Sequence, residues 1–212
     1  MARKQKTETS SAPSEAKFWV AFNLIPGVGT QRVRAMLARF GTLADAGRAT
    51  RSELKEAGLD SRTIKQITEQ RADIDPDAEW ERLEKVKVRA LTWDDPDYPS
   101  RLREIFDAPP VLYIRGELSP QDDLSVAVVG TRRPTPYVRQ VAEEMSYQLA
   151  AGRITVVSGL ARGVDGVAHR AALQAGGRTL AVLACGLDMV YPPEHKKLAA
   201  EITENGALLS EQ

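Results

Sequence analysis

The first third of the chain has apolar residues at helical spacing. The segment Phe18–Ile25 places its apolar side chains on one side of a helix before Pro26 ends the run, and a second helical pattern closes at Gly41. Capping residues open further short helical segments downstream. The pattern predicts a small all-α domain over residues 15–86, preceded by a disordered Ser/Thr/Lys-rich tail over residues 1–14.

The middle of the chain alternates in hydrophobicity instead. Residues 87–123 contain two short strand patterns, Val88–Trp93 and Pro110–Gly116, separated by an Asp/Pro-rich turn. We expect this segment to be a connector with short strands.

From residue 124 onward, apolar runs alternate with helical periodicity. We expect buried strands at Ser125–Val129, Ile154–Val157, Thr179–Ala184 and Ala207–Leu209, and helices at 136–151, 164–175 and 194–204. Strands and helices at this spacing are typical of parallel β-α-β units with helices on both faces of the sheet. The fold class predicted for residues 124–212 is therefore α/β, with a Rossmann-like parallel sheet.

Composition and charge narrow the possible partners. The 212 residues are 42% hydrophobic and 27% charged, which is enough apolar material for a buried core. The net charge is zero, but residues 73–123 carry seven basic and fourteen acidic side chains. This distribution excludes a uniform polyanion-binding surface, so any contact with nucleic acid must be local.

Targeting and redox signals point to the cytoplasm. Cys185 is the only cysteine, which excludes an intrachain disulfide and a structural zinc site. The basic start of the chain is not followed by an apolar core, and no apolar run approaches the roughly 20 residues that cross a bilayer. We expect a cytoplasmic protein without a membrane partner.

Two glycine-containing loops are the best candidates for chemistry. Ligands of parallel sheets bind at the carboxyl ends of the strands, where loops lead into helix N-termini. Free amides there, with a hydroxyl and a guanidinium, form a site for an anion, preferably phosphate. The candidate residues are Gly130, Thr131, Arg132 and Arg133 after the first strand, and Ser158, Gly159, Arg162 and Gly163 after the second.

A purely structural explanation of these glycines stays open, because tight turns between strands and helices require glycine whatever the ligand. Neither loop contains the G-x-G-x-x-G fingerprint, no acidic residue ends the second strand, and no Walker lysine is present. A mononucleotide could fit such a site, but a dinucleotide is disfavoured. We therefore predict no cofactor.

Catalytic interpretations are weaker. Ser158 lies outside a nucleophile elbow, Cys185 has no base beside it, and His195 is expected to be a surface residue at a helix start. Asp165 and His169 are four residues apart and can pair, and we expect such a pair to orient the loop rather than to act in acid–base catalysis. We predict no catalytic residue, no metal site and no enzymatic activity.

The helical part contains a second candidate contact. The segment Leu24–Arg34, with its Pro-Gly-Val-Gly turn and basic helix, resembles a helix-hairpin-helix motif, which contacts nucleic-acid phosphates without reading sequence. The alternative is a helical bundle whose turn merely packs and whose arginines form a solvated face. The residues of this contact would be Gly27, Gly29, Arg32 and Arg34.

Three longer motifs resemble the DNA-processing protein A family (DprA, also called Smf). They are Val128–Tyr137, Val157–Leu173 and Thr179–His195, and the upstream segment Asp97–Gly116 is similar as well. The resemblance is strong over residues 90–212. Over the helical part it is weak, and it implies a domain like a sterile alpha motif.

The resemblance implies a non-catalytic, cytoplasmic, single-stranded DNA-binding protein that protects incoming strands in natural transformation and loads the RecA recombinase in recombination. It assigns the two glycine-containing loops to the DNA pocket, and adds Lys196 and Lys197, although Pro193 and Glu194 precede them here. Family members continue past Gln212, so we expect a chain truncated within the Rossmann-like domain. The surfaces for RecA and for a homodimer would lie mainly in the missing part.

Two other classes of function remain as alternatives to test. One is a nucleotide-binding or nucleotide-processing enzyme on a related Rossmann-like scaffold. The other is an interaction module whose helical residues 18–72 recruit protein partners.

Overall fold

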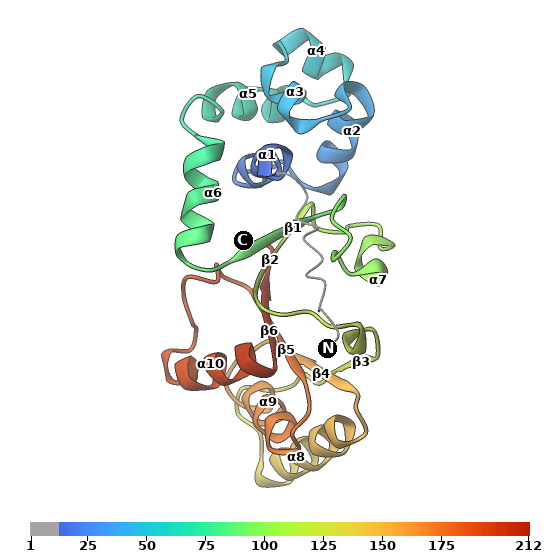
Figure 1. The fold of residues 1–212 in the computed structure, drawn as a ribbon, viewed down its shortest axis with the longest axis vertical. Coiled ribbons are helices and arrows are strands. Elements are labelled where there is room, and N and C mark those ends of the chain that lie inside the picture. The colour runs from blue at the N-terminus through green and yellow to red at the C-terminus, as the bar shows by residue number, and fades with distance from the viewer. Residues whose placement is uncertain (1–12) are drawn as a thin grey trace, which may run out of the picture.

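The fold is described from a computed structural model over residues 13–212 (Figure 1). Of the tail expected at residues 1–14, all but Pro13 and Ser14 lies outside the described residues, and these two begin the first helix. Six helices open the described chain: α1 (Pro13–Asn23), α2 (Thr30–Phe40), α3 (Leu43–Arg48), α4 (Arg51–Glu56), α5 (Ser61–Gln70) and α6 (Pro76–Lys85).

Local sequence explains where these helices begin. Thr42, Thr50, Asp60 and Asp75 are N-cap residues of α3 to α6, and each side chain accepts a hydrogen bond from a backbone amide of the first turn. No helix of the described part is long and apolar enough to cross a lipid bilayer.

A mixed six-stranded sheet follows, with the strand order β1-β2-β6-β5-β4-β3. Its strands β3 to β6 pair in parallel, whereas β1 pairs with β2, and β2 with β6, in antiparallel fashion. The strands are β1 (Arg89–Thr92), β2 (Val111–Gly116), β3 (Ser125–Ala127), β4 (Thr155–Ser158), β5 (Thr179–Leu183) and β6 (Gly206–Ser210). The connecting elements are α7 (Ser100–Arg103), η1 (Pro120–Asp123), α8 (Pro136–Ala151), α9 (Val164–Gln174), η2 (Pro193–His195) and α10 (Lys196–Asn205).

The α/β class predicted for this region is confirmed, and the strands of the expected connector prove to belong to the same sheet. The expectation of helices on both faces is wrong for α8, α9 and α10. Val156 packs with α8 and α9, and its same-face neighbours along the sheet, Ala181 and Leu208, pack with α10. Because the chain moves in one direction from β3 to β6, right-handed crossovers place these three helices on one face.

The first parallel strand also differs from expectation, since Ser125–Val129 was expected to be buried. All three residues of β3 are exposed and Val129 is 71% exposed, whereas Val128 between them is buried as expected. The reason is its position at the edge of the sheet, where only β4 pairs with it. The burial of a strand depends on its place in the sheet, which the apolar pattern does not contain.

The helices and the sheet share one apolar core. A single cluster of buried residues joins α1, α2 and α5 to β1, β2, β5 and α10. At the junction the rings of Trp19 and Trp93 meet edge to face, with centroids 5.4 Å apart. Because the core is shared, the division into a helical domain at residues 15–86, a connector at 87–123 and an α/β domain at 124–212 stays a prediction.

Candidate nucleic-acid interface

The carboxyl ends of β3, β4 and β5 lie at one end of the sheet, because these strands run in parallel. The loop after β3 leads into α8, whose N-cap Thr135 accepts a hydrogen bond from Val138 N. The loop after β4 leads into α9, whose N-cap is Gly163. Two helix N-termini therefore face the same end of the sheet, as the sequence predicts.

The first two loops are packed against each other. Val164 N donates to Thr131 O at 3.2 Å, which joins the loop after β3 to the start of α9. Gly163 has φ +81°, and a Cβ there would collide with the carbonyl oxygen of Thr131. A Cβ at Gly130 would lie 2.7 Å from a methyl carbon of Val164. These two glycines permit the close approach, so the structural explanation of the glycines holds alongside any ligand role.

Buried polar groups hold the second loop from below. The carboxylate of Asp165 accepts hydrogen bonds from Gly159 N at 3.1 Å and Ala161 N at 3.4 Å. The hydroxyl of Ser158 is buried and donates to Val128 O at 2.6 Å, so it ties β4 to the end of β3 and does not face solvent. Hydrogen bonds within the protein therefore fix the conformation of this loop without a ligand.

The two histidines have different partners from those expected. His169 does not pair with Asp165; its Nδ1 lies 2.7 Å from the Thr179 hydroxyl, which itself donates to Val156 O. His195 was expected on the surface, but it is buried, with Nδ1 2.8 Å from Leu160 O. Its ring packs against Gly166, and a Cβ on that residue would lie 2.7 Å from the ring carbon Cε1. His195 thus connects the third loop to the second.

The pKa of His169 is lowered to about 3. Burial is the main cause, because it disfavours the charged ring, and the nearby His195 and Arg170 add to the effect. Its Nε2 is buried without a hydrogen-bond partner in the described part of the chain. His169 is therefore neutral at physiological pH, and its ring packs and hydrogen-bonds in the interior of the fold.

The basic side chains of the three loops differ in whether they form ion pairs. Arg132 and Arg133 are exposed, and neither guanidinium bonds to a carboxylate of residues 13–212. Arg162 is also exposed, but Glu194 holds it in a bidentate pair, with Nε–Oε1 at 2.5 Å and Nη2–Oε2 at 3.2 Å. This pairing lowers the pKa of Glu194 to about 2.

The lysines at the start of α10 differ in the same way. Lys197 lies 3.6 Å from Glu201, whereas Lys196 is exposed and has no ion-pair partner within the described residues. Three exposed basic side chains of the strand-end loops, Arg132, Arg133 and Lys196, thus have no carboxylate partner among the described residues. The backbone of the first two loops is fixed by the contacts given above. Such an arrangement attracts and positions an anion.

The described residues provide no set of metal ligands. Among the described residues, no group of three or more histidine, cysteine, aspartate or glutamate side chains is placed to hold a metal ion.

The predicted helical contact lies around the turn between α1 and α2. Gly27 has φ +87°, a conformation that favours glycine. The guanidinium of Arg32 bonds to Asp60 at 3.0 Å, and that of Arg34 lies 5.3 Å from the ring centre of Trp93. Both predicted cations are thus engaged within the protein.

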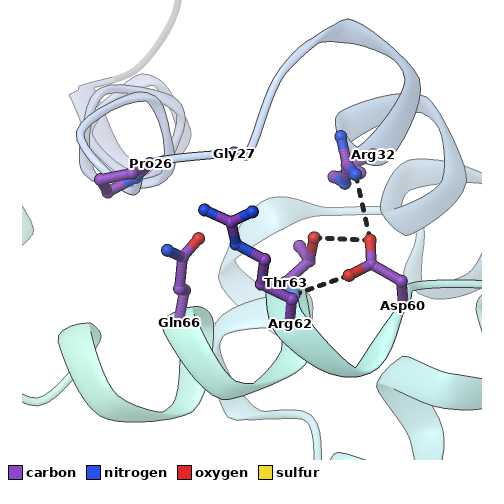
Figure 2. Close-up of a pocket in the computed structure, with 7 residues that line it drawn as sticks. All are labelled: Pro26, Gly27, Arg32, Asp60, Arg62, Thr63 and Gln66. Atoms are coloured by element: carbon purple, nitrogen blue, oxygen red, sulfur yellow. Dashed lines mark hydrogen bonds and ion pairs between the residues drawn. The ribbon is translucent and has the colours of Figure 1, made fainter.

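The same turn borders a pocket that also contains Arg62 and Gln66 of α5 (Figure 2). Neither residue is among the site residues predicted from the sequence. Their spacing of four places them on one face of α5, but only the packing of α5 beside the turn gives that face a neighbour.

A mixed sheet whose parallel strands lead into packed glycine turns, with the exposed guanidiniums of Arg132 and Arg133 beside them, defines an α/β protein with basic loops at its strand ends. Residues 89–212 match the family described as DNA recombination-mediator protein A. The chain belongs to this family.

Individual proteins of the same kind also match this chain in sequence. The protein Smf of Synechocystis is 38% identical over 205 residues, which are 94% of this chain and 52% of that protein. The DNA processing protein DprA of Bacillus subtilis is 38% identical over 125 residues, 58% of this chain and 42% of the relative. The chain spans about half the length of the curated relatives that it matches.

Two solved structures are similar as well. DNA processing protein A from Streptococcus pneumoniae superposes with a TM-score of 0.75 at 30% identity, over 92% of this chain and 67% of that one. DNA processing protein A from Helicobacter pylori gives a TM-score of 0.52 at 36% identity, over 59% of this chain and 56% of that one. The Helicobacter structure is described as giving insight into a single-stranded DNA binding mode.

Proposed function

We propose that the chain binds single-stranded DNA, independently of sequence, at the loops that follow β3, β4 and β5. The observation that carries the proposal is that Arg132 and Arg133 are exposed, have no carboxylate partner among residues 13–212, and lie on a loop fixed against the start of α9. The single-stranded DNA binding of the Helicobacter relative supports the choice of ligand.

In this proposal Arg132 and Arg133 bind backbone phosphates through charge-assisted hydrogen bonds, and Lys196 adds a third positive charge. Glycine amides at the strand ends help to position the phosphates. Glu194 occupies the Nε edge of Arg162 and neutralises its charge, so Arg162 has only its Nη1 side left for a phosphate and attracts one less strongly than the unpaired arginines do. Contacts to phosphates carry no sequence information, which accounts for sequence independence.

Membership of the family supports a proposal for the cellular role. We propose that the protein acts as a non-catalytic, cytoplasmic DNA-processing protein in natural transformation and recombination. Protection of the incoming strand, loading of RecA and assembly into a homodimer are the finer parts of the proposal. They concern the whole protein of the family, of which this chain spans about half.

Fluorescence anisotropy with labelled oligonucleotides tests the proposal. We expect the wild-type chain to bind a thymine homopolymer and a mixed sequence with similar affinity, and Arg132→Ala to weaken both by about 1–3 kcal/mol. The control is Arg51→Ala, which removes an exposed arginine from α4, away from the strand-end loops. Equal affinities of Arg132→Ala and the wild type would refute the site.

A further inference from the structure

We propose that the pocket between the α1–α2 turn and α5 is a second phosphate-binding site, in which Arg62 is the cation. The choice of nucleic acid as the source of the phosphate rests on the proposed function. None of the residues that line the pocket belongs to the strand-end loops.

The size of the pocket suits a small group. Its volume is about 240 Å³, below the roughly 300–1,000 Å³ of sites for drug-sized ligands. Pro26 and Gly27 form one wall, Arg32 and Asp60 a second, and Arg62, Thr63 and Gln66 the third. Figure 2 shows the Arg62 side chain rising from α5 toward the Gly27 turn, between Gln66 and the Arg32–Asp60 pair.

The acid of this pocket is fully engaged. Asp60 Oδ1 accepts from Thr63 N at 3.0 Å, while Oδ2 accepts from the Thr63 hydroxyl at 2.8 Å and from Arg32 at 3.0 Å. These bonds cap α5 and hold the pKa of Asp60 far below its usual range. Asp60 therefore stays ionised and neutralises Arg32.

The Arg62 guanidinium is left without a carboxylate partner among the residues described. Two guanidiniums and one carboxylate line the pocket, so it carries a net positive charge. An anion entering it would meet the free guanidinium of Arg62, which can bind two oxygens of a phosphate in parallel.

The opposite wall leaves room for such a group. Gly27 has φ +87°, and a Cβ at this position would lie 3.2 Å from Gln66 Oε1. Glycine at the turn therefore keeps the space beside the Gln66 amide open. The Gln66 side chain turns its amide oxygen toward Gly27 and Arg62 (Figure 2), so its amide nitrogen donates to the anion that Arg62 binds only after the amide group turns over. A purely structural role, in which Arg32 and Asp60 tie α2 to α5, uses neither Arg62 nor Gln66.

The pocket lies at the far end of the molecule from the strand-end loops, since α2 and α5 are at one end in Figure 1 and α8 and α9 at the other. A short strand cannot occupy both places, whereas a long one can. The site is therefore expected to strengthen the binding of long strands, as a second contact on the same polyanion.

The first test measures the affinity for a strand of about 30 nucleotides, which exceeds a single site of about 4–16 nucleotides. Arg62→Gln should weaken binding roughly three- to tenfold and lower the slope of log K against log salt by about 0.7. Lys65→Gln is the matched control, because it removes one charge from the same helix outside the pocket and should have less effect. An Arg62→Gln affinity equal to that of Lys65→Gln contradicts the proposal.

The second test does not depend on DNA. Inorganic phosphate is titrated into the full chain while NMR follows the Gly27 amide and the Gln66 side-chain amide. We expect saturable shifts in the wild type and in Arg132→Ala, and their loss in Arg62→Gln. Absence of shifts at millimolar phosphate overturns the pocket whatever the strand-end loops do. Saturable shifts in a protein that binds no DNA would instead refute the proposed function and retain the pocket.

Discussion

The strand-end loops and the α2–α5 pocket use the same chemistry on different supports. Each has one guanidinium bound to a carboxylate, Arg162 to Glu194 and Arg32 to Asp60, and each has an unpaired arginine beside it. At the strand ends, buried hydrogen bonds of Asp165 and His195 fix the backbone beneath the charges. At the pocket, the exposed ion pair between Arg32 of α2 and Asp60, the N-cap of α5, holds the two helices together. The first site therefore differs from the second in two ways, by a backbone fixed from the interior and by a larger number of basic side chains without a carboxylate partner among the described residues.

Two glycines make this comparison testable, and here the largest effect is expected. Gly163 and Gly29 are the N-caps of α9 and α2, and neither helix start has a side-chain cap. Gly163→Ala should lower the free energy of unfolding by about 2–4 kcal/mol, because φ is +81° and the added Cβ meets the Thr131 carbonyl. Urea denaturation monitored by circular dichroism measures the loss.

Gly29→Ala is the matched control. Its φ is −111°, and an added Cβ would have no neighbour within 4 Å, so the loss should be only a few tenths of a kcal/mol. Equal losses for the two variants would show that the strand-end loops are no more tightly fixed than the pocket.

The interior beneath the strand-end loops should also respond to pH. In the unfolded chain His169 takes up a proton near its ordinary pKa of 6.5, whereas in the folded protein it does so only near 3. The unfolded state therefore binds more protons in this window. The free energy of unfolding should fall as pH decreases from about 6.5 to 3, by at most about 1.4 kcal/mol per pH unit.

Urea denaturation at several pH values gives this slope for the wild type and for His169→Asn, whose amide can replace the hydrogen bond of Nδ1 to Thr179. The variant should lose the part of the slope between pH 6.5 and 5, where few carboxylates titrate. An unchanged slope there would mean that His169 is not the group responsible.

The smallest effect concerns the paired arginine of the strand-end loops. Glu194→Gln removes the charge that holds Arg162, so Arg162 becomes available to a phosphate, and the affinity for single-stranded DNA should rise about two- to fivefold. Anisotropy titrations compare this variant with Glu201→Gln, which frees Lys197 in the first turn of α10. Weaker binding by Glu194→Gln would show that the pair positions the loop and does not compete with DNA.

The sequence predicted much of the fold. Apolar periodicity located α8, α9 and the parallel strands to within a few residues, because each pattern reflects a local preference and a buried face. It could not give the order of the strands, which depends on pairing between distant segments. The exposure of β3 and the placement of α8, α9 and α10 on one face both follow from that order.

The candidate site was predictable in its position but not in its pairings. Glycines and arginines after two strands located the loops, since parallel strands bring their ends together. The ion pair of Arg162 with Glu194 and the burial of His195 join residues more than 30 positions apart, and no local pattern encodes them. Arg62 was missed for the same reason, because its pocket exists only where α5 meets the α1–α2 turn.

The salt dependence of single-stranded DNA binding at the first loop tests the central claim most directly. A plot of log K against log salt should be shallower for Arg132→Ala than for the wild type by about 0.7, the value expected when one phosphate contact of a single strand is lost. The same slope and the same affinity in both proteins would contradict the account.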